Sequence, residues 1–220
     1  MPYRAILFDL DGTLLDTLDD IADAGNAALT SHGFPAHPVP AYRHFVGEGV
    51  ATLIQRILAE NHRDEATLAA VAKSYVAAYQ KNWNIKSRPY PGIPEMLDEL
   101  ARRQIRLAIL SNKPHDFTCQ CVETFLAKWK FEEVLGATAK LPRKPNPAAA
   151  LHVAQMMQLP PADFLYLGDT NTDMQTAVAA GMYPVGVLWG FRDRPELEAA
   201  GAKTIIAHPS ELITLMMKFT

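Results

Sequence analysis

The sequence predicts an α/β protein: a doubly wound parallel sheet with an all-helical domain inserted after its first strand. Three observations lead to this fold class. Short apolar runs of strand length recur along the chain. Helical patterns alternate with these runs in the second half, which is typical of a parallel sheet with helices on both faces. Between the first and second runs lie about 70 residues with helical periodicity and no convincing strand, too many for a single crossover.

The core elements follow from these runs and from their flanking residues. Strands are predicted at residues 5–8, 107–110, 134–135, 164–167 and 185–188, with a weaker one at 204–207. Helices are predicted between them at residues 93–103, 116–128, 148–158 and 171–180. Asn146-Pro147 is typical of a helix start, with an N-cap followed by proline, and Gly181 is typical of a helix end. An amphipathic helix at residues 209–219 is expected to pack on the core.

The inserted segment is predicted to be a helical unit of its own. Asp16 or Thr17 can cap a helix that runs to residue 28, with Asp19 and Asp20 in its first turn, where the helix dipole favours acids. Further helices are expected at residues 40–45, 49–60 and 64–82. The predicted organisation is therefore a core of residues 1–15 and 89–220 with a helical domain of residues 16–88.

Composition excludes several classes of protein. Of the 220 residues, 49% are hydrophobic and 20% charged, as in an ordinary globular protein. A net charge of −3 gives no electrostatic reason to expect nucleic acid or a membrane surface as a partner. No apolar run approaches the roughly 18 residues of a membrane span.

The first strand follows the N-terminus so closely that no secretory signal is expected. Cys119 and Cys121 lie two positions apart on a predicted helix, where their side chains diverge, so we expect no disulfide between them. These features favour a reduced, cytoplasmic protein.

The heptad Phe8-Asp9-Leu10-Asp11-Gly12-Thr13-Leu14 carries the main functional signal. Asp9 and Asp11 are two residues apart, so on extended backbone their carboxylates point to the same side. They lie where the first strand ends, and ligands of parallel sheets bind beyond the carboxyl ends of strands. Two carboxylates about 4 Å apart repel by roughly 4 kcal/mol at an effective dielectric of about 20. A site that keeps both needs a cation, a shared proton, or both.

Three other polar groups follow predicted strands. They are Ser111-Asn112-Lys113, the segment around Lys144-Pro145, and Gly168-Asp169 with Asp173. Each alone has an ordinary explanation, as a turn, a solvated loop and a helix cap. Their joint occurrence at strand ends favours one shared site.

Other ligand-binding motifs fail on spacing. Residues 169–173 match the start of an EF-hand loop, but Met174 stands where glycine is needed and Ala180 where glutamate is needed. The chain has no P-loop and no dinucleotide-binding glycine motif after a strand.

Four motifs follow one another along the chain: Asp9-Leu10-Asp11-Gly12-Thr13-Leu14, the strand-end Ser111, Lys144 in a Lys-Pro-x-Pro sequence, and the acids Asp169 and Asp173. In these motifs and their order, the chain resembles the haloacid dehalogenase-like superfamily of phosphatases. That superfamily has a Rossmann-like core, and the helical insertion is similar to its cap. Three further segments resemble its phosphoglycolate phosphatase subgroup, namely Ser111-Asn112-Lys113-Pro114, Val46-Gly47-Glu48-Gly49 and Trp189-Gly190.

The resemblance implies catalytic roles for four residues. Asp9 would be the nucleophile and form an aspartyl-phosphate. Asp11 would protonate the leaving oxygen and later activate water. Ser111 would donate a hydrogen bond to the phosphoryl group, and Lys144 would supply a fixed positive charge.

The resemblance also implies a metal and substrate contacts. Mg²⁺ would be held by Asp9, by Asp169 and by the backbone carbonyl of Asp11, and Asp173 would support the site directly or through water. Oxygen ligands and a phosphate substrate favour this ion. The backbone amides after Asp9, at Gly12 and Thr13, and that of Asn112 would cradle the phosphoryl group.

Substrate choice is expected to depend on the cap. Arg43, His44, Gly47 and Glu48 cluster between two cap helices, and Arg43 suits a substrate carboxylate because its guanidinium can form two parallel hydrogen bonds. The predicted partner is a small phosphorylated metabolite, with 2-phosphoglycolate as the leading candidate. Another small phosphate, pyrophosphate, a phosphomutase reaction and a catalytically silent binding or regulatory protein remain open. Retention of Asp11 argues against a dehalogenase, and the sequence favours no oligomeric state.

Overall fold

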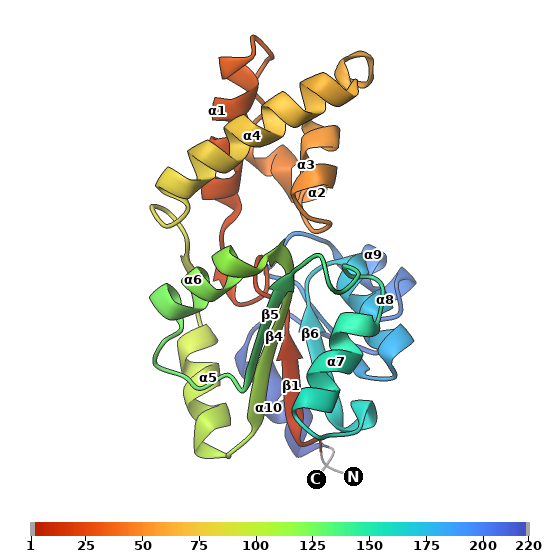
Figure 1. Cartoon of the computed structure of the whole chain (residues 1–220). Helices are drawn as coiled ribbons and strands as arrows, with labels where there is room; N and C mark the ends of the chain where they lie inside the picture. The colour runs from red at the N-terminus through yellow and green to blue at the C-terminus, as the bar shows by residue number, and fades with distance from the viewer. Residues whose placement is uncertain (1–2, 219–220) are drawn as a thin grey trace. The chain divides into compact units, whose positions relative to one another are not determined.

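The computed structural model describes residues 3–218 (Figure 1). The chain forms two compact units, one of Met1–Leu15 with Pro89–Thr220 and one of Asp16–Arg88. Where the chain passes between them, the two-residue strands β2 (Leu15–Asp16) and β3 (Arg88–Pro89) pair with each other. Among residues 3–218, no helix has both the length and the apolar character needed to cross a membrane.

The first unit is built on a six-stranded sheet in the order β5-β4-β1-β6-β7-β8, in which all neighbours are parallel. Its strands are β1 (Ala5–Phe8), β4 (Arg106–Pro114), β5 (Glu133–Ala137), β6 (Phe164–Gly168), β7 (Tyr183–Val187) and β8 (Thr204–Ile206). The strand order reverses beside β1, which pairs with β4 on one side and β6 on the other. This is the kind of switch point at which α/β sheets bind ligands.

Helices cover both faces of this sheet. They are α5 (Ile93–Arg102), α6 (His115–Phe125), α7 (Ala148–Met156), α8 (Asn171–Ala180), α9 (Arg194–Ala199) and α10 (Ser210–Met217), with the short 3₁₀ helix η3 (Pro161–Asp163). Sequence reasoning predicted each of them except α9 and η3. Residue 219, where the last helix was predicted to end, lies outside the described residues. The predicted fold class is confirmed.

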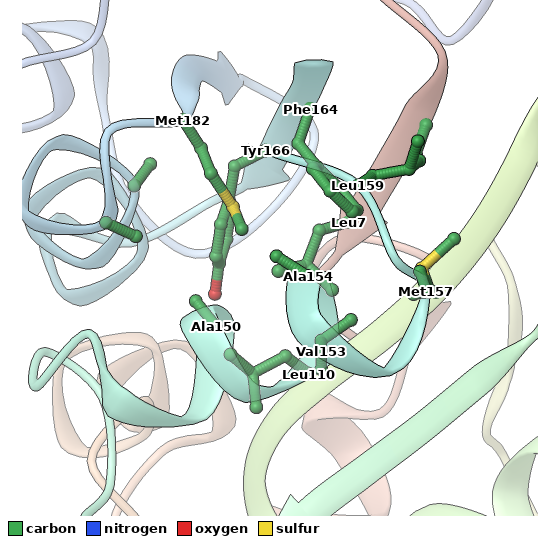
Figure 2. Close-up of a cluster of buried hydrophobic side chains, with 14 of the residues drawn as sticks. Leu7, Leu110, Ala150, Val153, Ala154, Met157, Leu159, Phe164, Tyr166 and Met182 are labelled. Atoms are coloured by element: carbon green, nitrogen blue, oxygen red, sulfur yellow. The ribbon is translucent and has the colours of Figure 1, made fainter. Parts of the chain in front are cut away.

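The apolar core explains why the strand sequences are continuously hydrophobic. On one face, alternate strand residues such as Leu7, Leu110 and Phe164 pack against α7 and α8 (Figure 2). Their sequence neighbours, such as Ile6 and Leu165, are equally buried on the opposite face. A strand covered on both sides has no solvent-facing position, so its sequence shows no polar alternation.

Strand β4 is longer than predicted. Its pairing with β5 shifts register between Leu110 and Pro114 and resumes at Pro114 opposite Ala137. The polar run from Ser111 to Lys113 was predicted to lie beyond the strand, whereas it lies inside the strand's last part. Pairing with β5 on both sides of this run, at Leu110 and at Pro114, keeps it extended. Gly136 allows the close approach of β5, because a Cβ there would lie 2.5 Å from the Cα atom of His115.

The second unit is helical. It comprises α1 (Leu18–Ser31), η1 (Val39–Ala41), α2 (Tyr42–Phe45), α3 (Val50–Ile57), η2 (Glu60–His62) and α4 (Glu65–Asn82). α1 packs along α4, and Tyr42 is fully buried, with its hydroxyl donating to Asn26 Oδ1 at 3.0 Å. Gly25 makes room for this ring, because a Cβ there would lie 2.4 Å from the Tyr42 hydroxyl oxygen.

Asp20 ties the start of this unit to its end. Only 1% of the residue is exposed. Its carboxylate accepts hydrogen bonds from the backbone amides of Lys86 and Ser87 and, at 2.7 Å, from the Ser87 hydroxyl. The predicted place of Asp20 in the first helical turn is correct, but its main contacts lie 66 and 67 residues further along the chain.

Candidate active site

Polar side chains meet at the carboxyl ends of the three central strands of the first unit. Asp9 directly follows β1, Ser111 lies in the last part of β4, and Asp169 directly follows β6. Because β1, β4 and β6 are parallel, their carboxyl ends share one edge of the sheet. Four sequence segments that are far apart thus converge there, the fourth being the loop that carries Lys144.

Lys144 is the cation at the centre of this cluster. Its ammonium nitrogen lies 2.8 Å from Asp9 Oδ1 and 2.7 Å from Asp173 Oδ1, and it donates to the Leu110 carbonyl oxygen at 3.0 Å. Only 2% of its side chain is exposed. Burial by itself lowers the pKa of Lys144, but the charges of Asp173 and Asp9 outweigh this and raise it well above its ordinary value. The lysine is therefore held as a cation.

Asp9 is oriented through one of its two oxygens. Oδ1 accepts hydrogen bonds from the Leu10 amide at 2.7 Å and from Lys144. Oδ2 forms no hydrogen bond or ion pair with the described residues, which leaves that oxygen for a ligand. Burial raises the pKa of Asp9 well above its ordinary value, and the charge of Asp173 raises it further. An ionised Asp9 therefore needs the neighbouring positive charge.

Asp169 is enclosed by the loops around it. Thr13 Oγ1 donates to its Oδ1 at 3.0 Å, and the Phe191 amide donates to its Oδ2 at 2.8 Å. Gly12, with φ +85°, and Gly190 let backbone come close: a Cβ on either would lie within 2.5 Å of Asp169 atoms. Burial raises the pKa of Asp169 to about 7, and the charge of Asp173 contributes to the shift.

Asp173 combines a structural role with an electrostatic one. Its Oδ2 accepts from the Thr170 amide at 3.1 Å and from the Thr170 hydroxyl at 2.7 Å, so it belongs to the capping box at the start of α8. Its Oδ1 faces Lys144 and the Tyr166 hydroxyl. Both the helix-cap explanation and a place in the acidic cluster therefore apply to this residue.

The acids fit a hard divalent cation. Asp9, Asp169 and Asp173 each offer a carboxylate oxygen, and the three oxygens lie within 4.8 Å of one another. Oxygen donors of this kind suit Mg²⁺ or Ca²⁺ rather than softer metals. Asp9 and Asp169 are better suited to direct coordination than Asp173. Each oxygen of Asp173 accepts two hydrogen bonds from protein donors, whereas each oxygen of Asp169 accepts one.

Asp11 is held by a second lysine. Lys113 Nζ donates to Asp11 Oδ1 at 2.9 Å and to Oδ2 at 3.1 Å, and 5% of the lysine side chain is exposed. The two acids of the first motif thus contact different lysines. Asp9 contacts Lys144, which lies in the loop before α7, and Asp11 contacts Lys113, which lies at the end of β4.

Ser111 and Asn112 lie beside this pair with distinct partners. Ser111 Oγ accepts from the Lys113 amide at 3.2 Å, which leaves the hydroxyl hydrogen available to donate. The Asn112 side chain exchanges two hydrogen bonds with the Lys144 backbone, at 3.0 and 2.9 Å. Asn112 therefore positions the loop that supplies the central lysine.

The remaining predicted substrate contacts stay predictions. The amides of Gly12 and Thr13 donate to the Leu15 and Leu10 carbonyl oxygens within their own loop. Arg43 lies in α2 of the helical unit.

Sequence reasoning missed two participants. Tyr166 is fully buried in β6, and its hydroxyl lies 3.4 Å from Asp173 Oδ1. Figure 2 shows its ring among the apolar side chains of the core, so its sequence context predicts only packing. Lys113 lies inside a motif that was singled out, but nothing in the pattern indicates that it faces Asp11.

The site's sequence segments are those of a known family. The family model described as haloacid dehalogenase-like hydrolase matches residues 6–187, from β1 to the end of β7. The chain belongs to this family.

Relatives within the family carry phosphatase names. A phosphoglycolate phosphatase from Psychrobacter arcticus is 30% identical over 99% of this chain and 97% of its own length. A solved structure from Lactobacillus delbrueckii subsp. bulgaricus, provisionally named a phosphoglycolate phosphatase, has a TM-score of 0.91 at 28% identity and covers 98% of this chain and 99% of its own. The predicted resemblance and the predicted enzyme class, a phosphatase, are confirmed.

The haloacid dehalogenase-like fold by itself does not separate a phosphatase from a mutase. A solved structure from Bacteroides vulgatus, provisionally named a β-phosphoglucomutase, has a TM-score of 0.78 at 20% identity and covers 99% of this chain and 90% of its own.

Proposed function

We propose that this haloacid dehalogenase-like phosphatase is a Mg²⁺-dependent phosphomonoester hydrolase that works through an aspartyl-phosphate. The observation that carries the proposal is the arrangement around Asp9. One of its oxygens is fixed by Lys144 at 2.8 Å, a second buried acid, Asp169, lies beside it, and Asp11 follows two residues later. A buried carboxylate held in place with one oxygen left over suits nucleophilic attack.

The first step transfers the phosphoryl group to Asp9. Oδ2 of Asp9 attacks phosphorus while the bond from phosphorus to the leaving oxygen breaks. Asp11, in its protonated form, gives its proton to that oxygen, so the oxygen leaves as a neutral hydroxyl group of the product. In the second step, Asp11 takes a proton from the water that attacks phosphorus, and the carboxylate of Asp9 is released.

Two polar groups act on the phosphoryl oxygens. Lys144 is buried, so its positive charge is not screened by water and opposes the negative charge of the transferring group. The Ser111 hydroxyl retains a hydrogen to donate to a phosphoryl oxygen.

Mg²⁺ would be held by carboxylate oxygens of Asp9 and Asp169 with the Asp11 carbonyl oxygen. When bound, the ion neutralises phosphate charge and orients the phosphoryl group. Asp173 would support the site through Lys144 rather than as a ligand, because each of its oxygens already accepts two hydrogen bonds, from Lys144 and Tyr166 on one side and from Thr170 on the other.

The proposed substrate is a small organic phosphate with a carboxylate, best represented by 2-phosphoglycolate. The relatives named phosphoglycolate phosphatases support this choice. Arg43 of α2 is the proposed carboxylate ligand. Arg43→Ala should raise KM for 2-phosphoglycolate more than for ethyl phosphate, a phosphate ester without a carboxylate, and equal changes in both would refute this role.

The deciding experiment is phosphate release from a panel of 2-phosphoglycolate, pyrophosphate, hexose phosphates and p-nitrophenyl phosphate. Wild type should release phosphate with Mg²⁺ and not with EDTA, and Asp9→Asn should release none. Product analysis of the hexose phosphates tests the mutase alternative, because a mutase moves the phosphate without releasing it. Absence of Mg²⁺-dependent release from every compound would refute the proposal.

A further inference from the structure

We propose that Lys113 is the residue that positions Asp11 for proton transfer to the leaving group. The inference rests on the proposed function and adds to it a residue for which the resemblance implied no role. Its basis is the two-point contact in which Lys113 Nζ lies 2.9 and 3.1 Å from the two oxygens of Asp11.

The backbone of Lys113 is held on several sides. Its amide donates to Ser111 Oγ at 3.2 Å, and its carbonyl oxygen accepts from Thr118 Oγ1 of α6 at 3.2 Å. Strand β5 packs against the same carbonyl, since a Cβ on Gly136 would lie 2.8 Å from it. A lysine anchored in this way can locate the carboxyl group that its ammonium contacts.

The contact is compatible with both states that Asp11 passes through. As a carboxylate, Asp11 accepts hydrogen bonds from Lys113 through both oxygens. As a carboxylic acid, it carries the proton on one oxygen, and the other oxygen still accepts from Lys113. Holding that second oxygen turns the O–H toward the leaving group, and the proton then moves as the bond from phosphorus to oxygen breaks.

Lys113 differs from Lys144 in the carboxylates that it contacts. Lys144 bridges Asp9 and Asp173, where the phosphoryl group is attacked. Lys113 contacts the acid that serves the departing side. Its loss should therefore matter most when the leaving group needs a proton.

The test compares esters that differ in this need. We would measure kcat/KM, which covers the steps up to departure of the leaving group, for p-nitrophenyl phosphate, phenyl phosphate and 2-phosphoglycolate. For Lys113→Met we expect kcat/KM to fall less than about 3-fold with p-nitrophenyl phosphate, about 10-fold with phenyl phosphate and about 100-fold with 2-phosphoglycolate. The reason is that p-nitrophenolate departs without a proton, whereas general acid catalysis is worth about 10²–10⁴-fold for a leaving group that needs one. Lys113→Arg, which keeps the charge and the donors, should recover most of the loss.

Two further variants complete the design. In an Asp11→Ala background, Lys113→Met should cause no additional loss with p-nitrophenyl phosphate, because the residue acts through Asp11. Lys128→Met removes an exposed ion pair with Asp98 and should leave all three kcat/KM values unchanged. If Lys113→Met does not fold, Lys113→Gln takes its place with the same expected order of losses.

Two outcomes would overturn the inference. Equal losses across the three esters would show that Lys113 serves phosphoryl binding or the fold. A loss confined to 2-phosphoglycolate, with phenyl phosphate unaffected, would show that Lys113 binds the substrate carboxylate. Failure of the proposed function would be seen separately, as absence of Asp9-dependent phosphate release by wild type.

Discussion

Lys144→Met is the most informative change to the charge balance of the active site. The substitution removes the ammonium group and keeps an unbranched apolar side chain. It leaves Asp9, Asp169 and Asp173 buried within 4.8 Å of one another without their cation. We expect a large loss of stability in metal-free protein, together with loss of activity.

The magnitude follows from the distances. At 2.8 Å from Asp9, the attraction is about 6 kcal/mol at an effective dielectric of about 20, with a similar value for Asp173. Part of this offsets the cost of burying the charges, so removing one partner of such a pair costs about 3–5 kcal/mol. That is a large share of the roughly 5–15 kcal/mol that separates folded from unfolded protein.

The loss should depend on pH. Burial and neighbouring charge raise the folded-state pKa of Asp9 above its unfolded value. A carboxyl of this kind binds its proton more tightly in the folded state, so its contribution to stability is present at low pH and is lost as pH rises through the folded pKa. Without Lys144 the carboxyls lack their cation, so their pKa values should rise further. The difference between variant and wild type should therefore be larger at pH 8 than at pH 5.5.

The assay is urea unfolding followed by circular dichroism, in EDTA, at both pH values. Lys128→Met is the matched control, because it breaks an ion pair whose lysine side chain is 64% exposed, and it should change nothing measurable. A Lys144→Met protein within about 1 kcal/mol of wild type at pH 8, as for an exposed ion pair, would refute the reasoning.

Three further outcomes are expected. Mg²⁺ should raise the thermal midpoint of wild type more at pH 8 than at pH 5.5, because protons compete for Asp169 below its pKa of about 7. Asp169→Asn should abolish the shift, and differential scanning fluorimetry measures both effects. Gly12→Ala should lower both the thermal midpoint and the Mg²⁺ response, since its Cβ would lie 2.2 Å from Asp169 Oδ2. Asp20→Ala should cost about 2–3 kcal/mol and speed hydrogen exchange at the Ser87 amide, which loses its acceptor.

The chain offers a control for each of these outcomes. Gly181→Ala imposes a similar backbone strain, at φ +72°, but meets no atom within 4 Å, so it should leave the Mg²⁺ response intact. Asp23→Ala breaks an exposed ion pair with Lys86 and should leave exchange at Ser87 unchanged. A Mg²⁺ shift retained in Asp169→Asn, or an equal Mg²⁺ response in the two glycine variants, would contradict the proposed metal site. Unchanged exchange in Asp20→Ala would contradict the role of that carboxylate.

The strand ends explain why most of the site could be predicted from sequence. Asp9 and Asp169 each follow an apolar run that is buried on both faces, and in a parallel sheet such runs end at one edge. The periodicity therefore indicated the fold and which polar residues lie together. It did not indicate α9, which has six residues and little apolar periodicity.

Contacts between side chains were harder to predict. The polar residues of Ser111-Asn112-Lys113 were expected beyond β4, because polar residues at the end of an apolar run usually mark its end. Pairing with β5 on both sides of these residues keeps them in the strand, and that pairing depends on Gly136, which lies 23 to 25 residues further along. The contact of Tyr166 with Asp173 could not be predicted either, because nothing in the sequence of a buried strand indicates an acid near the tyrosine hydroxyl.

The sequence by itself determined the α/β fold class, the family and the acids and lysine that converge on the site, because these depend on local periodicity and on motif order. Only the tertiary structure decided which charges pair: Lys144 with Asp9 and Asp173, Lys113 with Asp11, and Asp20 with the amides of residues 86 and 87. These pairs join residues 29 to 135 positions apart. Such contacts depend on how strands and loops pack. The order of residues along the chain does not specify these distances, because they arise only when the sheet has formed.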